Sequence, residues 1–156
     1  MSGWFSANGE TMHATAIVVG ETGILFVGPS GAGKSTMAFA CLAGAISRGW
    51  NAALVADDRT CLTVHSGRCI ASCPEPIRGK LELRGGGIVD LPRIGRAVMH
   101  LAVAPGPPSV KSRLPPDNEI FTCDGVELHL QRLWRDGATD PLTALCALRP
   151  DRFLSN

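Results

Sequence analysis

A glycine-rich segment at residues 28–35 (GPSGAGKS) constrains the fold of this chain more than any other feature. It matches the pattern G-x-x-x-x-G-K-[ST] of phosphate-binding loops, and it directly follows the apolar run ILFV at residues 24–27. The residues after it, 35–46, are rich in alanine and favour a helix. The sequence therefore predicts a buried strand, a phosphate-binding loop and a helix, in that order.

A loop of this type binds phosphate for clear physical reasons. Successive main-chain N–H groups form an anion-binding concavity, and the N-terminus of the following helix adds a partial positive charge. Lys34 is placed to neutralise the outer phosphates of a nucleotide, and the Ser35 hydroxyl is placed to ligate Mg²⁺. We therefore predict a nucleotide-binding site made by Gly28, Pro29, Ser30, Gly31, Ala32, Gly33, Lys34, Ser35 and Thr36.

Composition limits the classes of protein to consider. A chain of 156 residues with 45% hydrophobic and 19% charged residues is typical of one globular domain, here spanning 1–156. The net charge of +1 gives no indication of a nucleic-acid partner, and no apolar stretch is long enough to predict a membrane span. The six cysteines form no C-x-x-C pair and the first residues show no secretion signal, so we expect reduced thiols in a cytoplasmic protein rather than a zinc site.

The rest of the chain reads as short strands linked by turns. Periodicity and turn residues predict hairpins over 12–27 and 60–71 and strands over 52–56 and 98–104. The segment 121–130 contains a turn and then a strand over 126–130. We also predict a glycine-rich loop over 77–91, a mobile proline-rich connection over 104–117, and a helix over 142–148 with Asp140 as N-cap and Pro141 in its first turn. Two helices among many hairpins do not fit the alternating rhythm of a doubly wound fold. We therefore predict an α/β domain with a mixed, hairpin-rich sheet.

Two adjacent carboxylates, Asp57 and Asp58, follow the strand predicted at 52–56. Beside a phosphate site, carboxylates at a strand end hold Mg²⁺ through water or accept a proton from an attacking hydroxyl; the alternative is a solvated turn. Neighbouring side chains of an extended segment point to opposite sides, so we expect the two aspartates to have different roles.

Three further polar residues are candidates with plainer alternatives. His13 begins the first hairpin, and a lone histidine is more often structural than catalytic. Glu82 lies in the glycine-rich loop, where a solvated carboxylate is the ordinary interpretation. Arg113 lies on the proline-rich connection, from which it could reach a transferring phosphoryl group or simply face solvent. His65, His100 and His129 are interpreted as structural or surface residues.

These motifs together resemble the catalytic domain of the HPr kinase/phosphorylase family. The resemblance covers residues 12–92 and consists of HATA at 13–16, the phosphate loop, LVADD at 54–58, IRG at 77–79 and LELRGGGIVD at 81–90. It implies a P-loop fold similar to that of phosphoenolpyruvate carboxykinase, with ATP and Mg²⁺ as cofactors. It also implies hexamers and an HPr-like phosphocarrier protein as the partner, phosphorylated on serine.

The resemblance also implies a role for each matching residue. Lys34 would bind phosphate, Ser35 and Glu82 would hold the metal, and Asp58, of the pair with Asp57, would accept the serine proton. His13 and Arg113 would support the site.

Three departures from the family pattern qualify the prediction. The chain resembles the short form that consists of the catalytic domain only, Thr36 stands where longer forms usually have Glu, and no Pro-Gly-Arg-Asn loop is found. Kinase activity is therefore favoured over phosphorylase activity. A P-loop kinase of small molecules and a nucleotide-sensing module without turnover are the alternatives.

Overall fold

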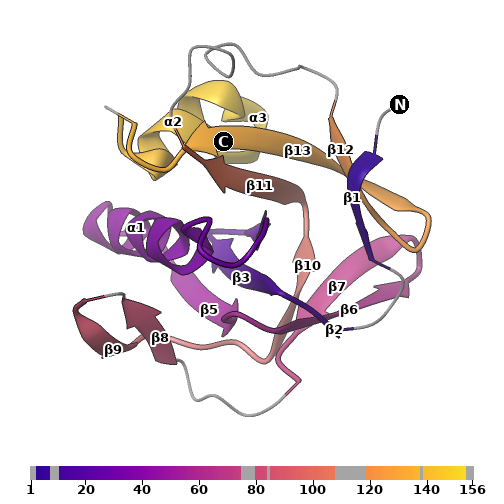
Figure 1. The fold of residues 1–156 in the computed structure, drawn as a ribbon, viewed down its shortest axis with the longest axis horizontal. Coiled ribbons are helices and arrows are strands. Elements are labelled where there is room, and N and C mark those ends of the chain that lie inside the picture. Colours follow the sequence, from indigo (N-terminus) through magenta and orange to yellow (C-terminus); the bar gives the residue numbers. More distant parts are fainter. Residues whose placement is uncertain are drawn as a thin grey trace.

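The computed structural model describes residues 3–7, 11–74, 80–83, 85–107, 119–137 and 139–153 of the chain. Within these ranges the main chain forms three sheets and three helices, shown in Figure 1. The helices are α1 (Lys34–Ser47), α2 (Pro141–Leu148) and α3 (Pro150–Phe153).

A mixed, seven-stranded sheet forms the centre of the molecule. Its spatial order is β1-β12-β13-β11-β4-β3-β5, which are Gly3–Ala7, Ile120–Cys123, Val126–Trp134, Leu101–Gly106, Thr22–Val27, Ala14–Val19 and Ala52–Ala56. Strand β4 pairs parallel with β11 and antiparallel with β3. The α/β class with a mixed, hairpin-rich sheet is therefore confirmed, as are the hairpin over 12–27 and the strand over 52–56.

Two smaller antiparallel sheets accompany the central one. The four-stranded sheet has the order β10-β7-β6-β2, which are Arg96–Met99, Arg68–Ser72, Thr60–His65 and Thr11–Met12. The two-stranded sheet pairs β8 (Lys80–Leu83) with β9 (Gly87–Asp90). The prediction of a loop over 77–91 was therefore wrong for 80–83 and 87–90: the glycines that suggested a loop supply the turn of a hairpin, with Gly85 and Gly87 at positive φ.

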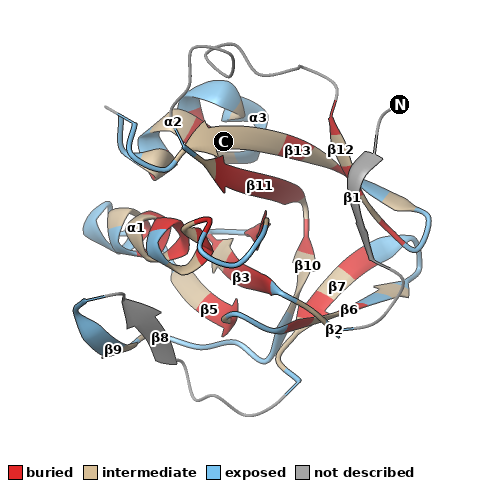
Figure 2. Cartoon of the chain, in the orientation of Figure 1, coloured by how far each residue is buried: buried red, intermediate tan, exposed pale blue. Residues whose placement is uncertain are grey.

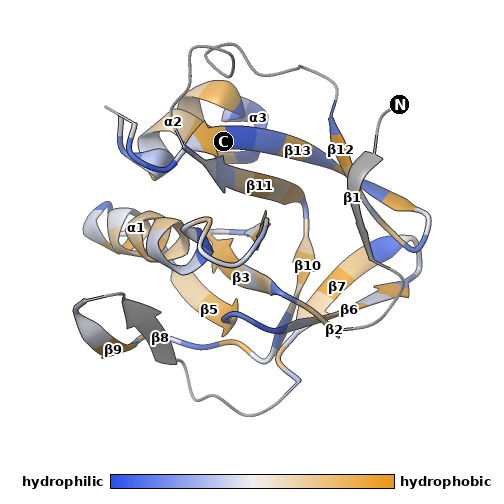
Figure 3. Ribbon diagram, in the orientation of Figure 1, coloured by the Kyte–Doolittle hydropathy of each residue, from blue (hydrophilic) through white to orange (hydrophobic). Residues whose placement is uncertain are grey.

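The central sheet carries apolar residues on both faces, and each face is covered by another layer of the molecule. Along β4, Ile24 and Phe26 pack with α1 and α2, whereas Leu25 and Val27 pack on the other face toward the four-stranded sheet. Figure 2 shows the buried residues concentrated in β3, β11 and the inner side of α1. Figure 3 shows the matching hydropathy, with β5 largely apolar and β13 alternating between polar and apolar residues. The strand that leads into residues 28–35 is thereby held in the middle of the core.

The strand predicted over 98–104 is divided in two by His100. Its first part, β10, belongs to the four-stranded sheet, and its second part, β11, to the central sheet. The main-chain N–H of His100 donates to Gly23 O at 2.9 Å, and the N–H of Gly23 donates to His100 Nδ1 at 2.9 Å. A Cβ on Gly23 would lie 1.9 Å from Val98 O, so only glycine allows the two sheets to approach here.

The second helix and the cysteines follow their predictions. Asp140 caps α2 by accepting from the N–H of Thr143 at 3.1 Å. None of the six cysteines, all of which are described, forms a disulfide. Burial raises the pKa of Cys41 and of Cys69 to about 12, which makes these two thiols unreactive near neutral pH. No helix in the described part of the chain is both long and apolar enough to cross a membrane.

Candidate nucleotide and phosphoryl-transfer site

The glycine-rich segment is a tight connection between β4 and α1. Gly28, Gly31 and Gly33 have φ of 139°, 84° and 98°, values that side chains rarely tolerate, which explains the glycine at each position. Gly33 is the N-cap of α1, and the N–H of Met37 donates to its carbonyl at 3.0 Å. The loop therefore directs main-chain N–H groups and the positive end of α1 to the same place.

Lys34 lies inside this loop with its side chain 7% exposed. Its ammonium donates to Gly28 O at 2.8 Å and to Pro29 O at 3.0 Å. Burial lowers the pKa of Lys34, while the charges of Asp58 and Asp57 act in the opposite direction. A buried ammonium group at the N-terminal end of a helix is a site to which phosphate is electrostatically suited.

Asp57 is fixed by hydroxyl groups from two elements. Its Oδ1 accepts from Ser35 Oγ at 2.5 Å and from Thr15 Oγ1 at 2.9 Å. Thr15 is fully buried in β3, and its Oγ1 also accepts from the N–H of Asp58 at 3.3 Å. The hydroxyl of Thr15 therefore positions both aspartates relative to α1.

Asp58 has a different environment from Asp57. Its side chain is 73% exposed, and its Oδ1 lies 3.8 Å from His13 Nδ1, whose side chain is equally exposed. The two aspartates therefore differ in the contacts of their side chains, while their different roles stay a prediction. The extended backbone assumed in that prediction is wrong at Asp58, which has a φ of 68°.

A cavity of about 450 Å³ joins segments that are distant in the sequence. It is lined by the phosphate loop with Lys34 and Ser35, by both aspartates, and by Gly85 from the β8–β9 turn. Glu82 belongs to β8, where its main chain pairs with Ile88 of β9. Its side chain is not among the parts that the structure describes. Arg113 lies outside the described residues. Among the predicted site residues that are described, Lys34, Ser35, Asp57 and Asp58 line this cavity. His13 is not part of the lining but lies beside Asp58.

Sequence reasoning missed two residues that contact this site. One is Thr15, a polar residue inside an otherwise apolar strand, which was the available signal. The other is Arg135, whose Nη1 donates to Gly31 O at 3.2 Å and whose Cδ would lie 3.5 Å from a Cβ on Gly33. Arg135 follows β13, far from the loop in sequence, and no local pattern marks it.

The donor set is compatible with Mg²⁺ and nucleotide. The Ser35 hydroxyl and the Asp57 carboxylate are hard oxygen donors in contact with each other. Among the described residues, no group of three or more His, Cys, Asp or Glu side chains could hold a metal alone. Mg²⁺ commonly keeps water and phosphate oxygens among its ligands, so a site with few protein donors is compatible with it.

The fold and this site define a P-loop α/β domain of the phosphoenolpyruvate carboxykinase-like kind. The family model described as HPr Serine kinase C-terminal domain matches residues 5–99, more than half of the chain, and the chain belongs to that family.

Known relatives agree with this assignment. The HPr kinase/phosphorylase of Clostridium tetani (strain Massachusetts / E88) is 40% identical over 83 residues, and that of Clostridium botulinum (strain Eklund 17B / Type B) is 36% identical over 83 residues. Each alignment covers 53% of this chain but 25% of the relative, so the matched part is a quarter of those proteins. The solved structure of the Hpr(Ser) kinase/phosphatase from Coxiella burnetii is similar at a TM-score of 0.71 and 25% identity, covering 93% of this chain and 97% of that one.

Proposed function

We propose that this chain is an ATP-dependent protein-serine kinase that phosphorylates HPr or a related phosphocarrier protein. The observation that carries the proposal is the cavity in which the phosphate loop, the aspartate pair and the β8–β9 turn meet. Family membership supports the proposed reaction class and the proposed partner.

The phosphate end of ATP would lie in the loop of residues 28–33. Main-chain N–H groups and Lys34 would bind its phosphate oxygens. Bound Mg²⁺ would supply positive charge that offsets the negative charge of the phosphates. Ser35 and Glu82 are proposed as its ligands, and Asp57 would orient Ser35 through the 2.5 Å hydrogen bond.

Asp58 would act as the general base. The serine Oγ of the partner attacks the γ-phosphorus, the bond from that phosphorus to the bridging oxygen breaks, ADP leaves, and the serine proton passes to Asp58. His13, 3.8 Å from the carboxylate, would hold it in orientation. Arg113 would stabilise the transferred group, as the family resemblance implies.

The exposure of Asp58 favours a protein substrate over a small molecule. A small-molecule kinase encloses its substrate in a pocket with several convergent polar groups. Here the proposed base is 73% exposed and lies at the edge of the cavity, within reach of a serine carried on another protein. The hexameric state and a cytoplasmic location stay predictions.

Substitution of the proposed base tests this mechanism. Asp58→Asn keeps the shape of the side chain and tolerates the positive φ, so the variant should fold and bind ATP. We expect the transfer of label from [γ-³²P]ATP to purified HPr to fall by about 10²- to 10⁴-fold, because a general base contributes that much.

Asp124→Asn is a matched control, since Asp124 is also exposed at positive φ but lies in the β12–β13 turn outside the cavity. Its transfer rate should equal that of the unmodified protein. A normal rate in Asp58→Asn would remove Asp58 from the mechanism. If ATP raised the melting temperature of the unmodified protein without labelling any phosphocarrier, the chain would be a nucleotide sensor instead.

A further inference from the structure

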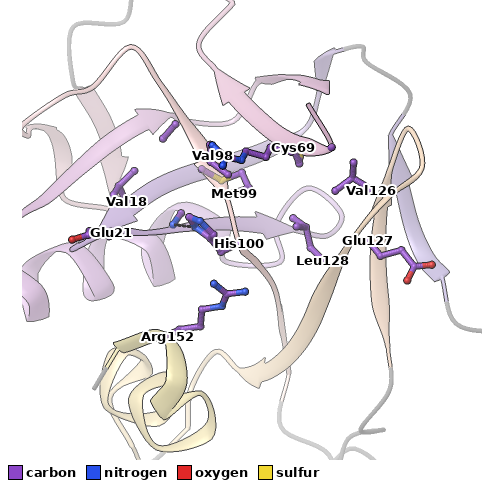
Figure 4. A pocket seen from close by; sticks show the side chains of 14 residues that line it. Val18, Glu21, Cys69, Val98, Met99, His100, Val126, Glu127, Leu128 and Arg152 are labelled. Atoms are coloured by element: carbon purple, nitrogen blue, oxygen red, sulfur yellow. Dashed lines mark hydrogen bonds between the residues drawn. The ribbon is translucent and has the colours of Figure 1, made fainter. Parts of the chain in front are cut away.

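A second cavity lies at the opposite end of β4 from the phosphate loop. Its volume is about 600 Å³. The residues that line it come from five places: the β3–β4 turn, the β6–β7 turn, the β10–β11 junction, the start of β13, and α3. Figure 4 shows this cavity from close by. Nothing in the proposed kinase mechanism uses these residues.

Three nitrogen-containing side chains from separate elements line the cavity: Arg68 of β7, His100 and Arg152 of α3. Figure 4 shows the guanidinium of Arg152 extending from α3 toward His100. Both arginines lie close enough to act electrostatically on His100. Within the described ranges, neither guanidinium has a carboxylate partner in an ion pair. The cavity therefore has two arginines whose charge is not neutralised by direct pairing.

His100 presents a neutral ring to this cavity. Because the N–H of Gly23 donates to Nδ1, the proton of the neutral imidazole lies on Nε2, which makes Nε2 a hydrogen-bond donor. Burial and the charges of Arg152 and Arg68 lower the pKa of His100, so the ring stays neutral at pH 7. His100 is also tied through its main chain to Gly23, which fixes the position of the donor.

The lining also includes apolar side chains. Cys69, Met99 and Leu128 are buried, and Val98 and Val126 are half-buried beside them. The two carboxylates of the lining, Glu21 and Glu127, are exposed, and in Figure 4 Glu127 points away from Arg152 and His100. The negative charges of these two carboxylates disfavour a ligand with several negative charges, whereas the two arginines and the apolar side chains favour a ligand with one negative charge on an apolar body.

We propose that this cavity binds a small organic monocarboxylate with an apolar body. A planar carboxylate matches the paired donors of a guanidinium, and Nε2–H of His100 supplies a further donor. The apolar body would lie on Val98 and Val126, the half-buried apolar side chains of the lining, which removes its surface from water. The proposal goes beyond the kinase function and does not depend on it.

Hexanoate and hexanamide form a probe pair that isolates the charge, since they have nearly the same shape. Each is titrated into the ¹⁵N-labelled full chain up to about 20 mM, a range that detects millimolar affinity. We expect hexanoate to cause saturable shifts of the amide signals of Cys69, Met99 and Leu128, with hexanamide at least about tenfold weaker. Equal binding of the two probes, or no saturable shift with hexanoate, would overturn the proposal.

Variants place the binding within the molecule. Arg152→Gln and Arg68→Gln should each lower the affinity for hexanoate by about tenfold or more. Both arginines are exposed, so each variant should keep the NMR spectrum of a folded protein. Arg96→Gln is the matched control, because Arg96 is exposed on β10 but does not line the cavity. Equal loss in all three variants would indicate a general effect of positive charge and contradict the site. Inorganic phosphate is a separate probe: if it shifted the same amides at the same concentration, the preference for a carboxylate would be wrong.

Discussion

The two ends of β4 carry two different kinds of site. At the C-terminal end, the phosphate loop follows directly, and its residues are neighbours in the chain. At the N-terminal end, Gly23 meets His100, Arg68 and Arg152, which come from three other places in the sequence. The first site is built mainly from main-chain groups of one segment, and the second mainly from side chains that only the folded chain assembles.

This difference determines how each end responds to mutation. The phosphate loop depends on the local geometry of its glycines and on the aspartates placed by β5. The second cavity depends on the contact between the central and four-stranded sheets, at Gly23 and Val98. A change in that contact should therefore disturb the second cavity first.

Gly23→Ala is the substitution with the largest expected effect, and it acts at the contact between the two sheets. The added Cβ would lie 1.9 Å from Val98 O and 2.7 Å from Met99 Cε, so the two sheets must move apart. We expect the free energy of unfolding to fall by about 3 kcal/mol or more, the upper range for overpacking. Urea unfolding measures this as a lower midpoint with an unchanged slope.

Gly95→Ala is the control for this experiment, because a Cβ there meets nothing within 4 Å and its φ is an ordinary one. It should unfold at the midpoint of the unmodified protein. The same midpoint for both alanine variants would contradict the close approach of the sheets. ATP binding by the folded fraction of Gly23→Ala should persist, since the loop lies at the other end of β4.

Thr15→Val is the second perturbation and acts on the phosphate end. The change removes the hydroxyl that donates to Asp57 and accepts from the N–H of Asp58. We expect a loss of about 1–2 kcal/mol in the free energy of unfolding, the effect of leaving a buried polar group without its partner. The rate of phosphoryl transfer should fall as well, while hexanoate binding at the second cavity should be unchanged.

Thr15→Ser separates the hydroxyl from the methyl group of this residue. It keeps the hydrogen bonds to both aspartates and should retain the transfer rate, with a small loss of stability from the missing methyl group. If Thr15→Val and Thr15→Ser lost the transfer rate equally, packing rather than the hydroxyl would position the aspartates.

Much of the fold could be predicted because its signals are local. Alternation and turn residues predicted the hairpin of β3 and β4, and the motif at 28–35 predicted the loop and α1. The division of 98–104 at His100 could not be predicted, because it depends on a glycine on another strand. Pairing of β8 with β9 was missed since four glycines close together are as typical of a loop as of a tight hairpin.

The phosphate site could be predicted better than the second cavity, because its signals are local in the sequence. The motifs that supply Lys34, Ser35, Asp57 and Asp58 are contiguous, and the structure places these residues around one cavity. Arg135 reaches the loop from the end of β13, and no pattern near it indicates the contact. His100 was interpreted as structural or surface, and its hydrogen bond to Gly23 agrees with a structural role; its contact with the second cavity came from the fold alone.

The smallest expected effect is a pH dependence that separates the two ends. His100 has a lowered pKa, so below about pH 6.5 the unfolded chain binds this proton more readily than the folded one, and stability falls as the pH drops through that range. Burial also lowers the pKa of Lys34, but from a usual value of 10.5, far above that of histidine. The charged groups around His100, namely Arg68, Arg152, Glu21 and Glu127, stay in place in the variant described next.

His100→Asn supplies an amide oxygen that can accept from the N–H of Gly23 but cannot be protonated in this range. Urea midpoints are compared between the variant and the unmodified protein from about pH 7.5 to about pH 5. The unmodified protein should lose more stability toward acid than His100→Asn, because protonation removes the acceptor at Nδ1 and places a third positive charge near Arg68 and Arg152. If the urea midpoints of the two proteins changed in parallel with pH, His100 would titrate alike in the folded and unfolded states. The proposal that a neutral His100 donates a hydrogen bond in the second cavity would then be contradicted.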